Sequence, residues 1–226
     1  MPKVEVKGTI VTNDDKWIYD WCEIQAVCPK DVAQALEGVT GDVTIEINSG
    51  GGNVFAGNEI GYLISQYKGN TTADIVGFCG SAATVIACSA NRVRAVPSAM
   101  YMIHNVAGGA SGDYHEMDKN SEILQKANKA ISATYQKKTG KSEKELLALM
   151  DRETWMTASE AKEDGFIDSI IGEDGNQPFT INNAFATILS DEAKQKIRNI
   201  AKQKESDNVS PFLMAQINLL KLKGEQ

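Results

Sequence analysis

One serine hydroxyl stands among small and apolar residues in the segment GFCGSAATVIA, residues 77–87. This residue is Ser81, and a histidine, His104, follows 23 positions later. A serine hydroxyl becomes a nucleophile when a neighbouring imidazole takes its proton, so the pair suits acyl transfer if the fold brings the two together. Each residue also has a structural explanation, because Ser81 can be the N-cap of a helix and His104 a hydrogen-bonded core residue. Taken singly, each is more often structural than catalytic.

Two carboxylates follow in the segment MDRETW, at Asp151 and Glu153. A carboxylate is the third group that orients the histidine beside a serine nucleophile. If the segment is extended, residues two positions apart share a face, and both carboxylates are then candidates for this role. The alternative is that they are solvated charges near the start of a helix.

A run of three glycines, Gly50–Gly52, lies in the segment INSGGGNVFAG, residues 47–57. A phosphate-binding P-loop requires a lysine where this chain has Asn58, and the dinucleotide-binding pattern GxGxxG requires a glycine where it has Phe55. What the segment offers is unobstructed backbone N–H groups, which can face another chain or a developing negative oxygen. A tight turn into a helix explains one or two glycines more easily than three in a row.

Strand and helix patterns alternate along the chain, and these elements must position the groups named above. Such alternation indicates an α/β domain with a largely parallel sheet, in which ligands meet the carboxyl ends of the strands. A helix that begins near Ser81 would place the Ser81 hydroxyl at the helix N-terminus, where the Ala82 amide can stabilise an oxyanion. The predicted strands are residues 3–10, 41–52, 71–78, 91–97 and 99–106. The predicted helices are residues 29–39, a segment through 60–67, 81–90 and 118–138. A further helix is capped by Thr157 and Glu160, and a last strand follows it.

Composition narrows the classes of function. The chain has 226 residues, of which 42% are hydrophobic and 23% charged, as in an ordinary globular protein. Its formal net charge of −7 argues against a general nucleic-acid binder, which would show a basic face. No stretch approaches the roughly 18 apolar residues of a membrane span, and the N-terminal MPKVEVKGTI lacks the apolar part of a secretory signal. We therefore expect no nucleic-acid partner, no membrane partner and a cytoplasmic location.

The numbers of cysteines and histidines argue against a metal centre. The four cysteines have no CxxC spacing, and only His104 and His115 could join them as ligands. We expect reduced, packed cysteines, no metal and no cofactor.

The order of these features resembles that of the proteolytic subunit of the Clp protease family, serine peptidases with a crotonase-like ββα superhelix. The resemblance covers roughly residues 4–171, and it implies this fold, with a protruding handle helix after the histidine segment. The matching stretches are INSGGGNVFAG, GFCGSAATVIA, MIHNVAGGASG, YQKKTGKSEKEL and WMTASEAKEDGFIDSI.

The resemblance implies a role for each matching residue. Ser81 falls on the family's nucleophile and His104 on its general base. The third member of the triad, usually an aspartate, falls on Glu153 in the register of WMTASEA, with Asp151 as the runner-up. The second histidine, His115, falls in the handle helix as a surface residue. The implied oxyanion-hole amides are those of Gly51 and Ala82, and the implied substrate-binding residues are Gly52, Gly108, Gly109 and Ala110.

The resemblance also implies homo-oligomeric rings that act on peptide or protein substrates. The first strand is expected at about Val4, whereas housekeeping members have a longer N-terminal segment that contacts an unfolding ATPase. This feature and the residues beyond Ile171 resemble the phage and prophage branch, whose members process capsid or scaffold proteins without an ATPase. One alternative is a degradative peptidase fed by an ATPase. Another is a non-catalytic crotonase-fold assembly protein, or a relative acting on acyl-CoA. Ser81 and His104 would have no catalytic role in this second alternative.

The chain is expected to have two parts, a peptidase domain of residues 1–173 and a helical C-terminal extension of residues 174–226. Residues 191–226 carry seven Lys or Arg and five Asp or Glu, a basic excess in an acidic chain. The apolar pattern of residues 210–224, SPFLMAQINLLKLKG, is typical of a packed terminal helix. An amphipathic docking helix or a segment cleaved in trans would show the same pattern.

Overall fold

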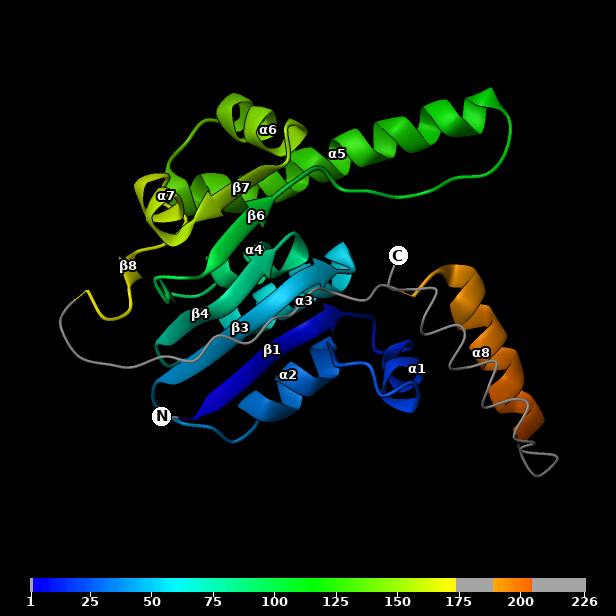
Figure 1. The fold of residues 1–226 in the computed structure, drawn as a ribbon, viewed down its shortest axis with the longest axis horizontal. Helices are drawn as coiled ribbons and strands as arrows, with labels where there is room; N and C mark the ends of the chain where they lie inside the picture. Colours follow the sequence, from blue (N-terminus) through cyan, green and yellow to red (C-terminus); the bar gives the residue numbers. More distant parts are fainter. Residues whose placement is uncertain (1, 174–188, 205–226) are drawn as a thin grey trace.

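Strands and helices alternate along the chain, as the sequence pattern predicts. The computed structural model describes residues 2–173 and 189–204, and Figure 1 shows their arrangement. The strands are β1 (Lys3–Ile10), β2 (Ala26–Val27), β3 (Val43–Gly52), β4 (Thr71–Gly80), β5 (Arg92–Ala95), β6 (Met100–Ile103), β7 (Thr154–Thr157) and β8 (Ser169–Ile170). The helices are α1 (Lys16–Trp21), α2 (Pro29–Leu36), α3 (Val54–Ser65), α4 (Ala82–Cys88), α5 (Tyr114–Thr139), α6 (Glu143–Asp151), α7 (Ala158–Glu163) and α8 (Asp191–Lys204).

The described strands form one sheet, which is parallel except at a single pairing. Its main path runs in the order β2-β1-β3-β4-β5-β8, and β6 leaves this path to pair with β4 and β7. The long strand β4 pairs with β5 along its first half and with β6 along its second half, both in parallel. Only β6 and β7 are antiparallel. The predicted α/β class with a largely parallel sheet is therefore confirmed.

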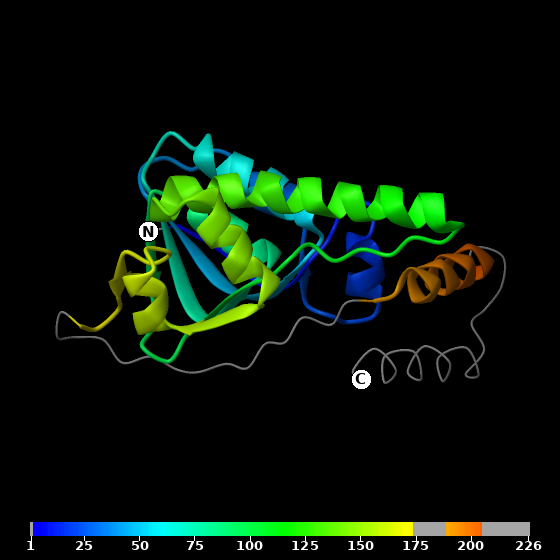
Figure 2. The same cartoon turned by 90° about the horizontal axis from the view of Figure 1, so that it is seen from above.

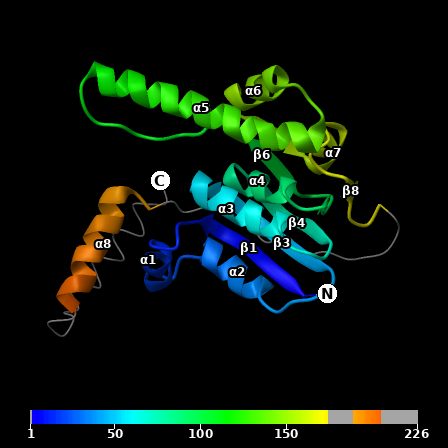
Figure 3. The same cartoon turned by 180° about the vertical axis from the view of Figure 1, so that it is seen from behind.

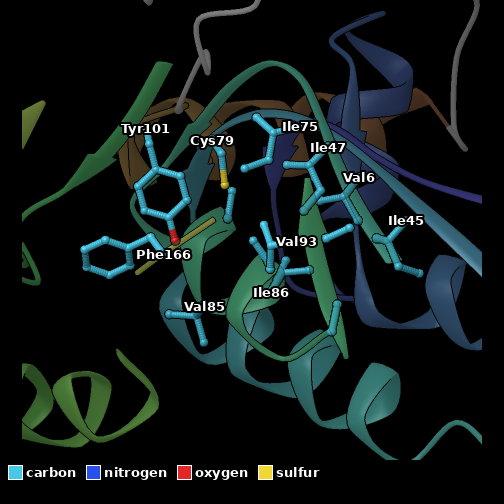
Figure 4. Packing of buried hydrophobic residues seen from close by; sticks show 14 of the residues in the cluster. Val6, Ile45, Ile47, Ile75, Cys79, Val85, Ile86, Val93, Tyr101 and Phe166 are labelled. Atoms are coloured by element: carbon cyan, nitrogen blue, oxygen red, sulfur yellow. The ribbon is translucent and has the colours of Figure 1, made fainter. Parts of the chain in front are cut away.

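Helices α2, α3 and α4 cover one face of the sheet, which is turned to the front in Figure 3. The core between them is built from β-branched and aliphatic side chains, and Figure 4 shows Ile86 of α4 together with Ile75 and Val93 of the sheet. Small residues allow α3 and α4 to approach closely, because a Cβ at Gly57 would lie 3.0 Å from the Ala82 Cβ. The small neighbours of Ser81 thus serve helix packing.

Helix α5 is the longest element, with 26 residues. It begins four positions earlier than predicted because Asp113 caps it and forms a reciprocal capping box with Glu116. Figure 1 shows its N-terminal half projecting beyond the sheet, and Figure 2 shows α6 crossing its C-terminal half. The buried half holds Tyr135, which is 2% exposed, whereas Tyr114 in the projecting half is 69% exposed.

Four short elements were not predicted, namely α1, β2, α6 and β7. Three of them are only two to six residues long, too short for a periodic pattern to emerge. Residues 151–153 do not form the extended segment in which both carboxylates would share a face. Asp151 is the last residue of α6, and Glu153 has a φ of +50°, so the chain turns sharply between the two carboxylates.

Helix α8 packs against α1 at the end of the sheet where β1 finishes. Leu189 and Ile197 join Ile18 and Tyr19 in a small apolar cluster. The Asp15 carboxylate forms ion pairs with Lys194 and Arg198 from α8. The described part of the expected extension is thus helical. The boundary at residue 173 stays a prediction, and the segment 210–224 lies outside the described residues.

Candidate active site

Ser81 and His104 lie at the same edge of the sheet, after the ends of two neighbouring parallel strands. Ser81 follows the end of β4, and His104 follows the end of β6. Because Gly80 and Met102 are register partners, the residues that follow the two strands meet. His104 Nε2 lies 2.7 Å from Ser81 Oγ, which is a hydrogen-bond distance. The structure therefore brings together the two residues that the sequence singled out.

The Ser81 side chain does not cap α4, although the residue occupies the N-cap position. It makes no capping hydrogen bond, and its hydroxyl is directed to the imidazole instead. The backbone adopts φ +52° and ψ −125°, a conformation that residues with a side chain rarely adopt. Strained backbone of this kind persists where the surrounding structure holds it, and it is enriched at active sites. The explanation of Ser81 as an ordinary helix cap is not supported.

Gly51 lies against Ser81, and only glycine fits there. Its φ is +99°, and a Cβ at this position would lie 2.7 Å from Ser81 Cβ and 2.9 Å from the Ala82 nitrogen. Gly52 is required for another reason, because its Cβ would lie 2.1 Å from the carbonyl oxygen of Ile10. The glycine run lets β3 pass close to β1 on one side and to the serine on the other.

The two amides expected to form an oxyanion hole differ in their present partners. Ala82 is the first residue of α4, a position whose N–H has no acceptor within the helix. The Gly51 N–H donates to Ser49 Oγ at 3.1 Å, and the Ser49 hydroxyl donates to the Gly8 carbonyl at 2.6 Å. To stabilise a substrate oxygen, Gly51 has to exchange the serine hydroxyl for it. The oxyanion roles remain predictions.

Two buried hydroxyls behind the nucleophile were missed from the sequence. Thr84 Oγ1 lies 2.5 Å from the Ser81 carbonyl oxygen and 2.6 Å from the Tyr135 hydroxyl. Thr84 could have been noticed as the second hydroxyl in an otherwise apolar run. Tyr135 continues the apolar face of α5 four positions after Ile131, but nothing local connects it to Ser81.

No hydrogen bond or ion pair joins either candidate carboxylate to His104 within residues 2–173. Glu153 accepts a hydrogen bond from the indole N–H of Trp155 at 3.0 Å. Asp151 accepts one from Asn105 Nδ2 at 2.7 Å, so it is tied to the residue that follows His104. The assignment of Glu153 as the acid, with Asp151 as runner-up, stays a prediction.

A cavity of about 380 Å³ opens beside Ser81 and His104. Its wall is mostly apolar, so it suits an apolar side chain of a ligand better than a charged one. The segment after His104 contributes Gly108 to the rim. The apolar lining residues include Val54 and Phe55 from α3, Met102 from β6, and Leu124, Ile131 and Tyr135 from α5.

The expected substrate-pairing residues Gly108, Gly109 and Ala110 are exposed and lie outside every strand of the described chain. A Cβ at Gly109 would meet no atom within 4 Å. The segment is therefore accessible to a ligand, and its first residue, Gly108, also lines the cavity. His115 lies in the first turn of α5 and is exposed, as expected of a surface residue.

Cys79, two residues before Ser81, is a poor rival nucleophile. Its side chain is fully buried, and burial raises the pKa of its thiol well above the ordinary value. Burial likewise raises the pKa of Cys88 to about 11. Within the part of the chain that the structure describes, no cluster of three His, Cys, Asp or Glu side chains could bind a metal, and no helix could span a bilayer.

Known proteins have similar sequences and a similar fold. A solved structure of a ClpP1 mutant from Listeria monocytogenes superposes with a TM-score of 0.63 at 25% sequence identity, covering 77% of this chain and 94% of that one. An ATP-dependent Clp protease proteolytic subunit from Bacteroides fragilis is 36% identical over 133 residues. That match covers 58% of this chain and 64% of the relative. A proteolytic subunit 1 from Chlamydia abortus is 33% identical over 133 residues, 57% of this chain and 69% of that protein.

The family comparison agrees with the fold. Residues 24–174 match the family model described as Clp protease, and this range contains Ser81, His104 and both candidate carboxylates. The chain therefore belongs to the Clp protease family and has the ClpP-type fold.

Proposed function

We propose that the chain is a serine endopeptidase that hydrolyses peptide bonds through an acyl intermediate on Ser81. The observation that carries this proposal is the 2.7 Å contact between His104 Nε2 and Ser81 Oγ. Proton transfer from a hydroxyl to an imidazole requires such a contact. The apolar cavity beside the pair and the names of the relatives, which are proteolytic subunits, support the same function.

The proposed reaction follows from the positions of these groups. Ser81 Oγ attacks the carbonyl carbon of the peptide while His104 Nε2 takes the proton. The N–H groups of Ala82 and Gly51 stabilise the negative oxygen, and loss of one such donor typically costs about 3–4 kcal/mol in the transition state. His104 then gives its proton to the leaving amine, and a water molecule releases the acyl group by the same steps. Glu153 orients the imidazole, with Asp151 as the alternative.

The proposed substrate is an extended peptide that lies along Gly52 and the exposed segment Gly108–Ala110. The apolar cavity takes the side chain next to the scissile bond, because a charged side chain there would lose its hydration without gaining a partner. Peptides with leucine or methionine at this position should be cleaved with a kcat/KM about a hundredfold higher than peptides with aspartate or lysine.

We propose that the active form is a homo-oligomeric ring assembly enclosing the sites. Apolar side chains exposed along α5 support this, since Tyr114 is 69% exposed, Ile123 52% and Met117 41%. Burial of these side chains between subunits would remove apolar surface from water. Native mass spectrometry measures the number of subunits directly, and a monomer at micromolar concentration would contradict this part of the proposal.

Two biological settings fit the proposed chemistry. The relatives named above include an ATP-dependent Clp protease subunit, which favours a degradative peptidase fed by an unfolding ATPase. Processing of a capsid or scaffold protein in phage assembly is the alternative. ATP-dependent loss of an unfolded substrate supports the first setting. Cleavage of a capsid or scaffold protein at discrete sites without ATP supports the second.

Active-site labelling tests the proposed function itself. A fluorophosphonate probe should acylate the assembled wild-type protein at one site, and Ser81→Ala should remove this labelling. His104→Gln should slow it, because the hydroxyl then has no base. If the assembled wild type takes up no probe and cleaves no peptide of the panel, the chain is better explained as a non-catalytic assembly protein.

A further inference from the structure

The backbone of Ser81 is held by three hydrogen bonds, and one residue makes two of them. The Ser81 N–H donates to the Met102 carbonyl at 2.9 Å. The Ser81 carbonyl accepts from the Thr84 N–H at 2.9 Å and from the Thr84 hydroxyl at 2.5 Å. Because Ser81 has a φ of +52°, these bonds oppose relaxation of the residue to an ordinary conformation. Thr84 therefore fixes the carbonyl side of the strained residue.

The direction of the hydrogen bond between Thr84 and Tyr135 follows from the single proton that the Thr84 hydroxyl can donate. A carbonyl oxygen only accepts, so the single hydroxyl proton of Thr84 is donated to Ser81. Thr84 Oγ1 can then only accept from the Tyr135 hydroxyl, which lies 2.6 Å away. The donors run in one line, from Tyr135 to Thr84 to the Ser81 carbonyl. Burial raises the pKa of Tyr135, so its hydroxyl keeps the proton that it donates.

Tyr135 links the nucleophile to the longest helix of the molecule. It lies in the buried half of α5, and its ring lines the cavity beside Ser81. The ring is fixed edge-on against Phe166, with centroids 5.6 Å apart. The Phe166 ring also contacts the Tyr101 ring, and Figure 4 shows the rings of Phe166 and Tyr101 side by side. A displacement of α5 relative to the sheet would therefore move the Tyr135 hydroxyl away from Thr84.

We propose that Tyr135 and Thr84 are positioning residues that hold Ser81 in its reactive conformation and make its reactivity depend on the placement of α5. The inference rests on the proposed serine peptidase function. Neither residue touches the reacting atoms; both act through the Ser81 carbonyl. Loss of either hydroxyl lets the strained backbone relax and moves Oγ away from His104 Nε2.

The test compares acylation rates of isosteric variants with the same probe. Tyr135→Phe keeps the ring in the cavity and should slow fluorophosphonate acylation about tenfold or more, since small displacements of a nucleophile are costly. For a cleaved peptide, kcat should fall by the same factor while KM stays within about twofold, because the cavity wall is unchanged. Tyr101→Phe is the matched control. The Tyr101 hydroxyl is also buried, but it contacts Cys88 Sγ at 3.4 Å and the Thr84 carbonyl at 3.5 Å, and it makes no hydrogen bond to the Ser81 backbone or to the Thr84 hydroxyl.

A second pair of variants keeps the test decisive if Tyr135→Phe folds poorly. Thr84→Ser retains the hydroxyl and should react like the wild type, whereas Thr84→Val removes it and should be slow. The double variant Thr84→Val with Tyr135→Phe should be no slower than Thr84→Val alone, because the two hydroxyls act in series. Equal acylation of wild type, Tyr135→Phe and Thr84→Val would overturn the inference and leave the peptidase standing. A wild type that takes up no probe would overturn the proposed function itself.

Discussion

Asn105, the residue that follows His104, donates a hydrogen bond from Nδ2 to Asp151 Oδ1 at 2.7 Å. Its other polar atom, Oδ1, is buried and has no hydrogen-bond partner among the described residues. Glu153 is anchored in a different way, through Trp155, whose ring stacks on Phe78 of β4 with centroids 5.3 Å apart and planes 4° apart. Asp151 is thus tied to the segment that contains His104. Glu153 is tied, through Trp155, to β4, the strand that ends just before Ser81.

The identity of the acid can be decided by removing each negative charge. We expect Glu153→Gln to lower kcat for a cleaved peptide at least about a hundredfold, because neutralising the acid of a triad disturbs the tautomer and orientation of the histidine. Asp151→Asn should lower kcat by less than about threefold, since it leaves the charge on Glu153. Steady-state kinetics at pH 7 measure both, with circular dichroism as a check on folding. A larger loss in Asp151→Asn would transfer the role of the acid to Asp151.

Substitution of Gly51 distinguishes the effect of a steric clash with Ser81 from the effect of backbone strain at a positive φ. Gly51→Ala should abolish acylation of Ser81, because the added Cβ would lie 2.7 Å from the Ser81 Cβ. Gly38→Ala is the matched control, with a φ of +69° and no atom within 4 Å of its added Cβ. Both variants should lose about 1 kcal/mol or more of unfolding free energy from the positive φ. Probe labelling and thermal unfolding of both proteins check this, and a normally labelled Gly51→Ala would show that the serine segment tolerates displacement.

The sequence predicts the pairing of Ser81 with His104 only through the resemblance to the Clp protease family, because the local patterns place Ser81 at a helix start and His104 inside the predicted strand 99–106. The hydrogen bond between Thr84 and Tyr135 joins residues 51 positions apart, and no local pattern encodes it. The sharp turn at Glu153 depends on where α6 ends, which the segment MDRETW does not show. The register of WMTASEA therefore assigns a carboxylate to the triad without showing how either side chain is oriented.

The ion pairs between β1 and β3 predict a pH dependence of stability. Hydrogen bonds from Lys7, at 2.6 Å, and from Lys3 hold the pKa of Glu46 below its ordinary value of 4.5. The stabilisation is complete above pH 4.5 and is lost as the pH falls through the lower value of the folded state. Glu46→Gln should therefore cost about 1 kcal/mol at pH 7 and progressively less below pH 4.5. Urea unfolding at several pH values measures the difference, and a constant cost would contradict the assignment.

The contact of α8 with the region of α1 combines an apolar cluster with one largely buried carboxylate. Asp15 is 14% exposed and pairs with both Lys194 and Arg198, so Asp15→Asn removes two ion pairs at once. We expect amide hydrogen exchange in α8 to become about tenfold faster or more, with exchange in β4 unchanged, because only the local opening of α8 is affected. Asp191→Asn is the control, since that carboxylate is fully exposed and lies 3.7 Å from Lys194. Equal exchange of α8 in wild type and both variants would mean that apolar packing against α1 holds the helix without the ion pairs.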